Sequence, residues 1–193
     1  MPDPQPIVLD TCVLVPSRLR DFLLSLAAEH AYQPMWNAVI LDELEYHERR
    51  RHIDFGVPEA EADRIARNLT DQMNSAFTGS LVDNWEHLDG TFGLPDPYDE
   101  HVVAAAVVAN AHVIVTDNLA DFPSQALPIG VKAITPAAFT AQIARSMPQI
   151  AITALTGMAQ RLRRPPMTPS AILDYMDTYY GFSETSTLMR PWL

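Results

Sequence analysis

Four carboxylates in this chain stand where secondary-structure elements are expected to begin, end or face inward. Asp10 follows one apolar run and Asp117 follows another, while Asp99 and Glu43 lie in expected helices. Carboxylates that converge on one point repel one another, and a divalent cation relieves that repulsion. Oxygen ligands with open positions suit Mg²⁺ or Mn²⁺, and such sites activate water for phosphodiester hydrolysis. We therefore take these four acids as candidate metal ligands and catalytic residues.

Glu43 is separated from its acidic neighbours by helical geometry. At about 100° per residue it shares a face with Ile40 and Leu44, whereas Asp42 and Glu45 point to the opposite side. A charge on an apolar face is costly to bury unless it is paired or binds a metal. The sequence thus favours Glu43 as the ligand, although an acid at the edge of a helix would give the same pattern.

A helix start precedes Asp99. Asp96 is typical of an N-cap, Pro97 of the first helical position, and Asp99 of an acid in the first turn. The residues from 102 to 109 are almost all Val and Ala, so the helix can pack closely on a sheet. Asn110 is expected to end it. Capping explains Asp96, which could also support the metal ligands from behind, and a dipole-favouring acid is the structural alternative for Asp99.

A buried strand over residues 112–115 leads to a polar tip, Thr116-Asp117-Asn118. Polar tips at the carboxyl ends of parallel strands are where α/β folds place their chemistry. Thr116 could orient water or a phosphate, and Asn118 and Asp121 could support the ligands from behind. A turn role explains Asp117 equally well, and Asp121 is typical of a cap or turn.

The remaining pattern predicts an α/β protein with a central parallel sheet between helical layers. Residues 1–145 are expected to form one compact unit, with 146–193 as a helical extension packed on its side. Strands are predicted at 7–10, at 32–36 (broken by Pro34) and at 131–134, and residues 80–88 are ambiguous between strand and loop. Helices are predicted at 17–30, at 37–51, and from residues 58, 135, 148 and 169.

Composition limits the partners and the compartment. The chain has 193 residues and a formal net charge of −11, which disfavours indiscriminate nucleic-acid binding. The basic run Arg49-Arg50-Arg51 is a candidate RNA contact, or simply a solvated helix end. Cys12 is the only cysteine and is expected to be a small core residue, and His101 is expected to be structural. No apolar run could span a bilayer and no signal peptide is evident, so we expect a cytoplasmic protein without membrane contact.

Several motifs in order resemble one known family. They are IVLDTCVLV, WNAVILDEL, LPDPYDEHVVAAAVVANAHVIVTDNLADFP, ITPAAF and RRPPMTPSAILDYM. The chain resembles PIN-domain ribonucleases, in the branch that includes VapC-type toxins of bacterial toxin–antitoxin pairs.

The resemblance implies an α/β/α sandwich and a Mg²⁺- or Mn²⁺-binding cluster formed by Asp10, Glu43 and Asp99. It also implies an RNA substrate, a small antitoxin partner near residues 17–30 and 37–52, and a homodimer. The family's fourth acid corresponds to Asn118 here, and the acid stands at Asp117 instead. That departure leaves open the fourth ligand and the number of metals.

Two other functions remain open. A phosphatase of the haloacid-dehalogenase type could use Asp10 as nucleophile with Thr116 as its strand-end threonine. Such enzymes need a second aspartate where this chain has Cys12, and an acidic pair after a late lysine, which Lys132 lacks. A catalytically weak PIN scaffold that only binds partners is the second alternative, and the three core acids disfavour it.

Overall fold

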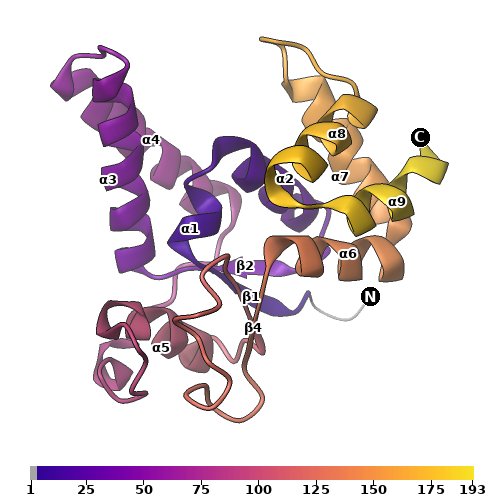
Figure 1. Ribbon diagram of the computed structural model, residues 1–193. Helices are drawn as coiled ribbons and strands as arrows, with labels where there is room; N and C mark the ends of the chain where they lie inside the picture. The colour runs from indigo at the N-terminus through magenta and orange to yellow at the C-terminus, as the bar shows by residue number, and fades with distance from the viewer. Residues whose placement is uncertain (1–3) are drawn as a thin grey trace.

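Four parallel strands form one sheet in the order β2-β1-β3-β4 (Figure 1). The computed structural model describes residues 4–193. The strands are β1 (Pro6–Leu9), β2 (Gln33–Met35), β3 (Val113–Val115) and β4 (Lys132–Ile134). In the register of β1 and β3, Leu9 stands opposite Val115, and the Asp10 N–H donates to the Val115 carbonyl over 3.1 Å. The residues that follow these two strands therefore begin as neighbours.

Helices cover both faces of the sheet, which confirms the predicted α/β architecture. Figure 1 shows α5 on one side of the sheet and α1 and α2 on the other. The α-helices are α1 (Thr11–Leu14), α2 (Ser17–Ala28), α3 (Ala38–Asp54), α4 (Glu59–Ala76), α5 (Glu100–Val108), α6 (Pro136–Ser146), α7 (Pro148–Arg161), α8 (Pro169–Tyr180) and α9 (Ser183–Met189). Short 3-10 turns are η1 (Glu86–Leu88), η2 (Pro97–Asp99) and η3 (Arg190–Trp192).

Several helix starts follow the predicted capping chemistry. The side chain of Asn37 accepts the Ile40 N–H at the start of α3, over 2.9 Å. Thr135 and Thr168 cap α6 and α8 in the same way, each followed by proline. A threonine or asparagine placed before a helix-compatible residue satisfies backbone donors that would otherwise be left without a partner.

Two local predictions were wrong, and one segment was left open. Pro34 does not break its strand: it pairs with Ile7 inside β2, which is an edge strand where a missing N–H is tolerated. The helix expected from Asp96 begins as the 3-10 turn η2, and α5 starts only at Glu100. Residues 80–88 form neither a full strand nor a simple loop, since Leu81 makes an isolated parallel bridge to Trp36 before η1.

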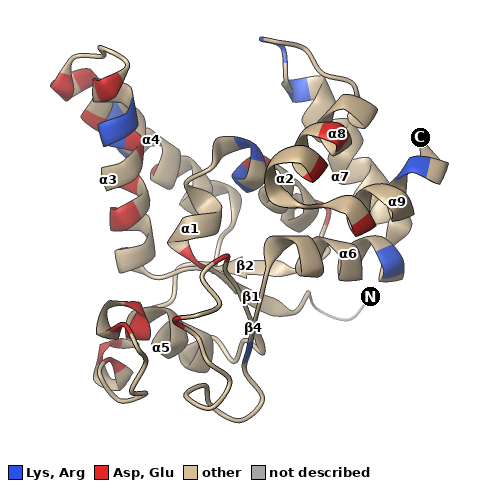
Figure 2. Cartoon of the chain, in the orientation of Figure 1, with Lys and Arg blue, Asp and Glu red and all other residues tan. Residues whose placement is uncertain are grey.

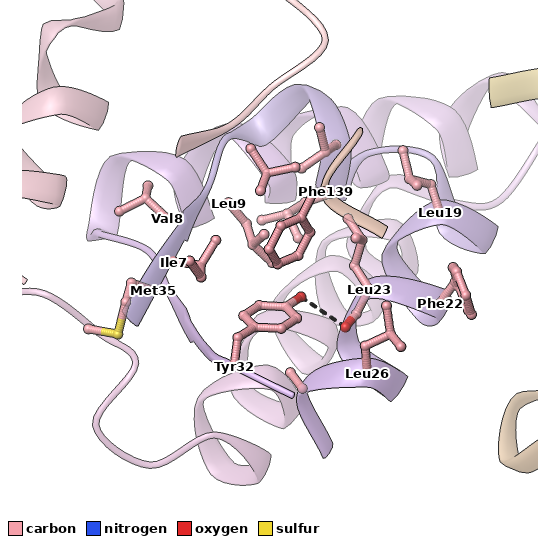
Figure 3. Packing of buried hydrophobic residues seen from close by; sticks show 14 of the residues in the cluster. Ile7, Val8, Leu9, Leu19, Phe22, Leu23, Leu26, Tyr32, Met35 and Phe139 are labelled. Atoms are coloured by element: carbon pink, nitrogen blue, oxygen red, sulfur yellow. Dashed lines mark hydrogen bonds between the residues drawn. The ribbon is translucent and has the colours of Figure 1, made fainter. Parts of the chain in front are cut away.

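A continuous apolar cluster runs from the sheet into the C-terminal helices. Around β1 it gathers side chains from α2 and α6 (Figure 3). Tyr32 stands among them, where its hydroxyl donates to the Leu23 carbonyl over 2.9 Å and its ring meets Phe139 edge-on. Leu155, Leu173 and Phe182 of the last fifty residues belong to the same cluster. None of the helices in residues 4–193 has the length and apolar character needed to cross a membrane.

Candidate active site

A pocket of about 620 Å³ opens at the carboxyl ends of β1 and β3, between α1 and α3. It brings together three of the predicted acids, Asp10, Glu43 and Asp99. The other lining residues are Thr11, Cys12, Val15, Pro16, Asp42, Tyr46, His47 and Asn118. In Figure 2 acidic positions lie on the elements around this region, and Lys and Arg positions lie on α2, on α3, at the ends of α6 and α7 and on β4.

Asp10 is held rigidly at the floor of the pocket. Its residue is 6% exposed, and its Oδ2 accepts the Thr116 hydroxyl over 2.6 Å and the Cys12 thiol over 3.0 Å. Thr116 is fully buried, and its Oγ1 in turn accepts the Asn118 N–H over 3.0 Å. With both donors on Oδ2, no side-chain donor within residues 4–193 occupies Oδ1, which remains available to a ligand.

Glu43 is positioned from two sides. The Thr11 hydroxyl donates to its Oε2, and the Nε2 of His101 lies 3.8 Å from its Oε1. His101 is 5% exposed, and its backbone carbonyl accepts the Asn37 side-chain amide over 3.0 Å. Burial lowers the pKa of His101, although Glu43, Asp10 and Asp89 act in the opposite direction. The neutral ring predominates at pH 7 and leaves the carboxylate charge of Glu43 uncompensated.

Asp99 is the carboxylate of the pocket whose pKa is clearly perturbed. Burial raises its pKa to about 6, and Asp10, Asp96, Asp121 and Glu43 contribute to the increase in that order. Nearby negative charge disfavours ionisation of one more carboxylate, which is the expected result when acids share a site. This repulsion shows that the predicted acids lie close enough to act on one another.

Glu100, the next residue, anchors the loop that precedes Asp99. It is 3% exposed, and its carboxylate accepts the backbone N–H groups of Phe92, Gly93 and Leu94 over 2.7–3.1 Å. Burial would raise the pKa of Glu100, but these backbone donors lower it below its ordinary value. The sequence analysis did not single out Glu100, because a first-turn glutamate gives no sign of which distant amides it will meet.

The residues of the polar tip after β3 lie in two different surroundings. Asn118 lines the pocket and its side-chain amide donates to Asp121, whereas Asp117 is exposed outside the pocket lining. Burial and Asp10 raise the pKa of Asp117, so it still lies within the electrostatic field of the site. Asp96 caps η2 by accepting the Tyr98 N–H over 2.9 Å. Asp96 thus makes a local capping contact, and Asn118, not Asp117, is the residue of the tip that lines the pocket.

One face assignment and one burial prediction from the sequence need correction. Asp42 is exposed but lines the same pocket as Glu43. Glu45 does point away and accepts the Thr70 hydroxyl of α4. Cys12 is only half-buried: it packs against the edge of the core, lines the pocket and donates to Asp10. Burial, followed by Asp10, raises the pKa of its thiol to about 12.

The basic run on α3 is largely engaged in ion pairs. Arg49 pairs with Glu59 and Asp63 of α4, and Arg51 pairs with the buried Glu48. Arg50 is exposed and makes no ion pair with any group in residues 4–193. Of the three candidate RNA contacts, Arg50 alone presents a charge without an intramolecular partner.

The acids of the pocket are of the chemical type that binds a hard divalent cation, but their present spacing does not form a metal site. Within residues 4–193, no three Asp, Glu, His or Cys side chains meet closely enough to form a ready-made metal cluster. Asp10 and Glu43 each lean toward a threonine hydroxyl. Three carboxylates on one pocket nevertheless match the ligand preference of Mg²⁺ and Mn²⁺.

Comparison with known protein families supports this fold. A family model described as the PIN domain matches residues 6–120. This chain belongs to the PIN-domain family. Over 77 residues this PIN domain is 40% identical to VapC50 of Mycobacterium tuberculosis, a protein named as a candidate ribonuclease. The match covers 39% of the chain and 46% of that relative, so it spans about half of the relative's length. No solved structure matches the chain.

Proposed function

We propose that this chain is a metal-dependent endoribonuclease that hydrolyses RNA phosphodiester bonds and acts as the toxin of a toxin–antitoxin pair. The observation that carries this proposal is the convergence of Asp10, Glu43 and Asp99 on one open pocket, where burial, followed by nearby acids that include Asp10 and Glu43, raises the pKa of Asp99 to about 6. Membership of the PIN-domain family and the similarity to VapC50 support it. Acids that repel one another in the free protein are suited to a dication and, through it, to phosphate.

In this proposal Asp10, Glu43 and Asp99 hold Mg²⁺ or Mn²⁺, and Asp117 is the candidate fourth ligand. When bound, the cation supplies a more acidic water and neutralises charge on the phosphate. The residues around the acids fix their orientation: Thr116 holds Asp10 Oδ2, and Thr11 holds Glu43 Oε2. Tyr46, exposed on α3 at the pocket wall, offers an aromatic face to a nucleotide beside the site.

Cleavage of a structured RNA, measured across Mg²⁺ and Mn²⁺ titrations, tests the proposal. Loss of a residue that merely supports a metal ligand costs about 10- to 100-fold in activity or metal affinity, so Asp10→Asn, Glu43→Gln and Asp99→Asn should each cost more. Glu45→Gln is the matched control on the same helix and should leave the rate unchanged. Asp42→Asn and Asp117→Asn should lie between these extremes. Full activity in both Asp10→Asn and Asp99→Asn would reject this acidic pocket as the nuclease site, whereas no metal-dependent cleavage by the wild-type chain would leave a binding-only scaffold.

The proposed antitoxin partner would bind beside α2, as the family resemblance implies. A groove of about 590 Å³ runs between α2, α4 and α7, and its apolar side chains include Leu24, Leu69 and Phe77. An amphipathic helix is the type of segment that fits such a groove. Co-expression with the product of the adjacent reading frame should yield a complex that inhibits cleavage, and Leu69→Glu should prevent the complex from forming. Light scattering of the purified chain would test the proposed homodimer.

A further inference from the structure

Three tyrosines of α8 gather beside the start of α2, next to the acidic pocket. The rings of Tyr175 and Tyr179 lie 4.4 Å apart between centroids, and those of Tyr175 and Tyr180 lie 6.1 Å apart. Tyr175 and Tyr180 pack partly against the core, whereas Tyr179 is 66% exposed. Tyr179 packs on the ring of Tyr175, which itself packs partly against the core. These contacts hold an exposed aromatic face in a fixed place.

A cation accompanies these rings. The Arg18 guanidinium carbon lies 5.0 Å from the centroid of Tyr175. Arg18 forms no ion pair within residues 4–193, and its Nη1 atom is buried without a hydrogen-bond acceptor. A buried donor on a charged group is costly to leave unsatisfied. Arg18 is therefore a positive charge beside the rings that has no anionic partner within residues 4–193.

This group lies outside the lining of the proposed catalytic pocket but near it. Arg18 follows by two residues Pro16, which lines that pocket. Burial, Tyr175 and Asp117 raise the pKa of Tyr180 to about 12 against the lowering effect of Arg18, so Tyr180 lies within electrostatic reach of both Arg18 and the tip after β3. In Figure 1, α8 and α3 lie on opposite sides of α1. Helix α8, which carries the tyrosines, thus lies on the other side of α1 from α3, which carries Tyr46.

We propose that Tyr175, Tyr179 and Arg18 form a platform that binds unpaired nucleotides of single-stranded RNA beside the acidic pocket, an inference that rests on the proposed ribonuclease function. Aromatic faces stack on any base, and a nearby arginine attracts the phosphates between them. Bases within a duplex are already stacked and cannot use such a face. The platform therefore selects RNA that is single-stranded on this side of the cut, with little preference for sequence.

The test uses the full-length chain carrying Asp99→Asn, so that binding is measured without cleavage. The probe is a fluorescein-labelled 12-nucleotide unpaired RNA, compared with an RNA duplex of equal length. Loss of one base–aromatic stack should weaken binding of the single strand by about 5- to 100-fold in Tyr179→Ala, and Tyr179→Phe should restore it. Trp192→Ala, which removes another exposed aromatic residue from the same extension, should leave the affinity unchanged.

A second readout separates stacking from charge. An RNA with 2-aminopurine at one position should lose fluorescence on binding, and that quenching should disappear in Tyr179→Ala but persist in Tyr179→Phe. Arg18→Gln should weaken binding while Lys132→Gln, the same charge change at an exposed site on β4, should not. Equal melting temperatures of the variants would show that folding is intact.

The outcomes distinguish this inference from the function on which it rests. Unchanged affinity and quenching in Tyr179→Ala would overturn the platform, even if the wild-type chain cleaves RNA. If Tyr179→Ala weakened the affinity for the single strand and for the duplex equally, the platform would be overturned as well. If Tyr179→Ala releases a co-purified protein without altering RNA binding, the surface belongs to a protein partner and the proposal is wrong. Absence of cleavage by the wild-type chain would reject the nuclease function alone.

Discussion

Asp99 makes the metal-free protein sensitive to pH at the scale of a single residue. Its pKa rises from an ordinary value of 3.8 to about 6 on folding, chiefly through burial and the charge of Asp10. The folded state therefore holds the proton more tightly, and ionisation destabilises it. This penalty is absent below about pH 3.8, grows as the pH rises through 6, and is complete above that value.

Asp99→Asn should therefore stabilise the chelator-treated protein at pH 7.5. The full shift would correspond to about 3 kcal/mol, but Asp99 is only partly buried and solvent screening reduces the effect to the order of 1 kcal/mol. Urea unfolding should show this gain at pH 7.5 and little of it at pH 4. Asp71→Asn, at an exposed acid on α4, is the control and should change little at either pH. A gain of the same size at pH 4 would show that charge repulsion is not its cause.

The sequence predicted which acids would meet better than it predicted their supports. Asp10, Glu43 and Asp99 were found from element boundaries and helical facing, both of which depend on local pattern. The contacts of Cys12 and Thr116 with Asp10 were missed, as was the approach of His101 to Glu43. These contacts join residues far apart in the chain, so they depend on sheet register and helix packing that no local pattern contains.

At the scale of elements, the loop before α5 depends on Glu100. Three neighbouring backbone N–H groups share its carboxylate, and the loop leads directly to Asp96 and Asp99. In Glu100→Gln an amide NH₂ would face one of these donors and the charge would be lost. Hydrogen bonds to a charged group contribute about 1.5–3 kcal/mol each, so we expect a loss of roughly 2–4 kcal/mol in unfolding free energy.

Hydrogen exchange locates that effect. The amides of Phe92, Gly93 and Leu94 should exchange faster in Glu100→Gln. The exchange rates of the α7 amides should change only by the amount that the change in global stability accounts for. Glu86→Gln, at an exposed glutamate in η1, should behave like the wild type. Protection of residues 92–94 that survives the substitution would mean that the loop is held by other contacts.

Element boundaries were predicted best where capping chemistry is local. The starts of α3, α6 and α8 follow directly from Asn37, Thr135 and Thr168. The short helix α1 was missed because four residues show no periodicity, although it carries the chain from Asp10 to α2. The η2 turn was taken as the first turn of α5, since a cap followed by proline looks the same before either type of helix.

At the scale of the molecule, the extension after residue 145 should be inseparable from the rest. Helix α7 packs along α2, and the ring of Phe182 lies 6.2 Å from that of Phe22. Fully buried Leu155, Met158 and Leu173 lie in the shared cluster. Burying such a side chain contributes about 1.5–3 kcal/mol, and losing several exceeds much of the roughly 5–15 kcal/mol available to a domain.

A chain ending at residue 145 should therefore aggregate or unfold, with exposed apolar surface that binds a hydrophobic dye. The full chain should melt in a single transition followed by circular dichroism. A chain ending at 189 is the control, because it removes only η3 and leaves Phe182 and Met189 in place. If the 1–145 chain melts like the full protein, the extension would be an independent unit and not part of the same domain.

The balance of charge over the whole chain sets how RNA binding should respond to salt. Eight of the thirteen Lys and Arg side chains form ion pairs within residues 4–193, which leaves five. Those five are Arg18, Arg50, Lys132, Arg163 and Arg164. Each phosphate neutralised on a single strand contributes about −0.7 to the slope of log K against log salt. Phosphate contacts from all five side chains would therefore give a limiting slope of about −3.5.

We expect a measured slope between about −1 and −3, because one strand cannot reach all five cations at once. Arg18→Gln should make the slope shallower by about 0.7, while Tyr179→Ala should weaken binding at every salt concentration and leave the slope unchanged. The measurement is anisotropy of the labelled single strand from 50 to 300 mM KCl, in the Asp99→Asn chain. A slope steeper than about −5 would mean that ion pairs such as Arg49–Glu59 open to bind phosphate, and that the basic run on α3 contributes more to RNA affinity than the platform on α8.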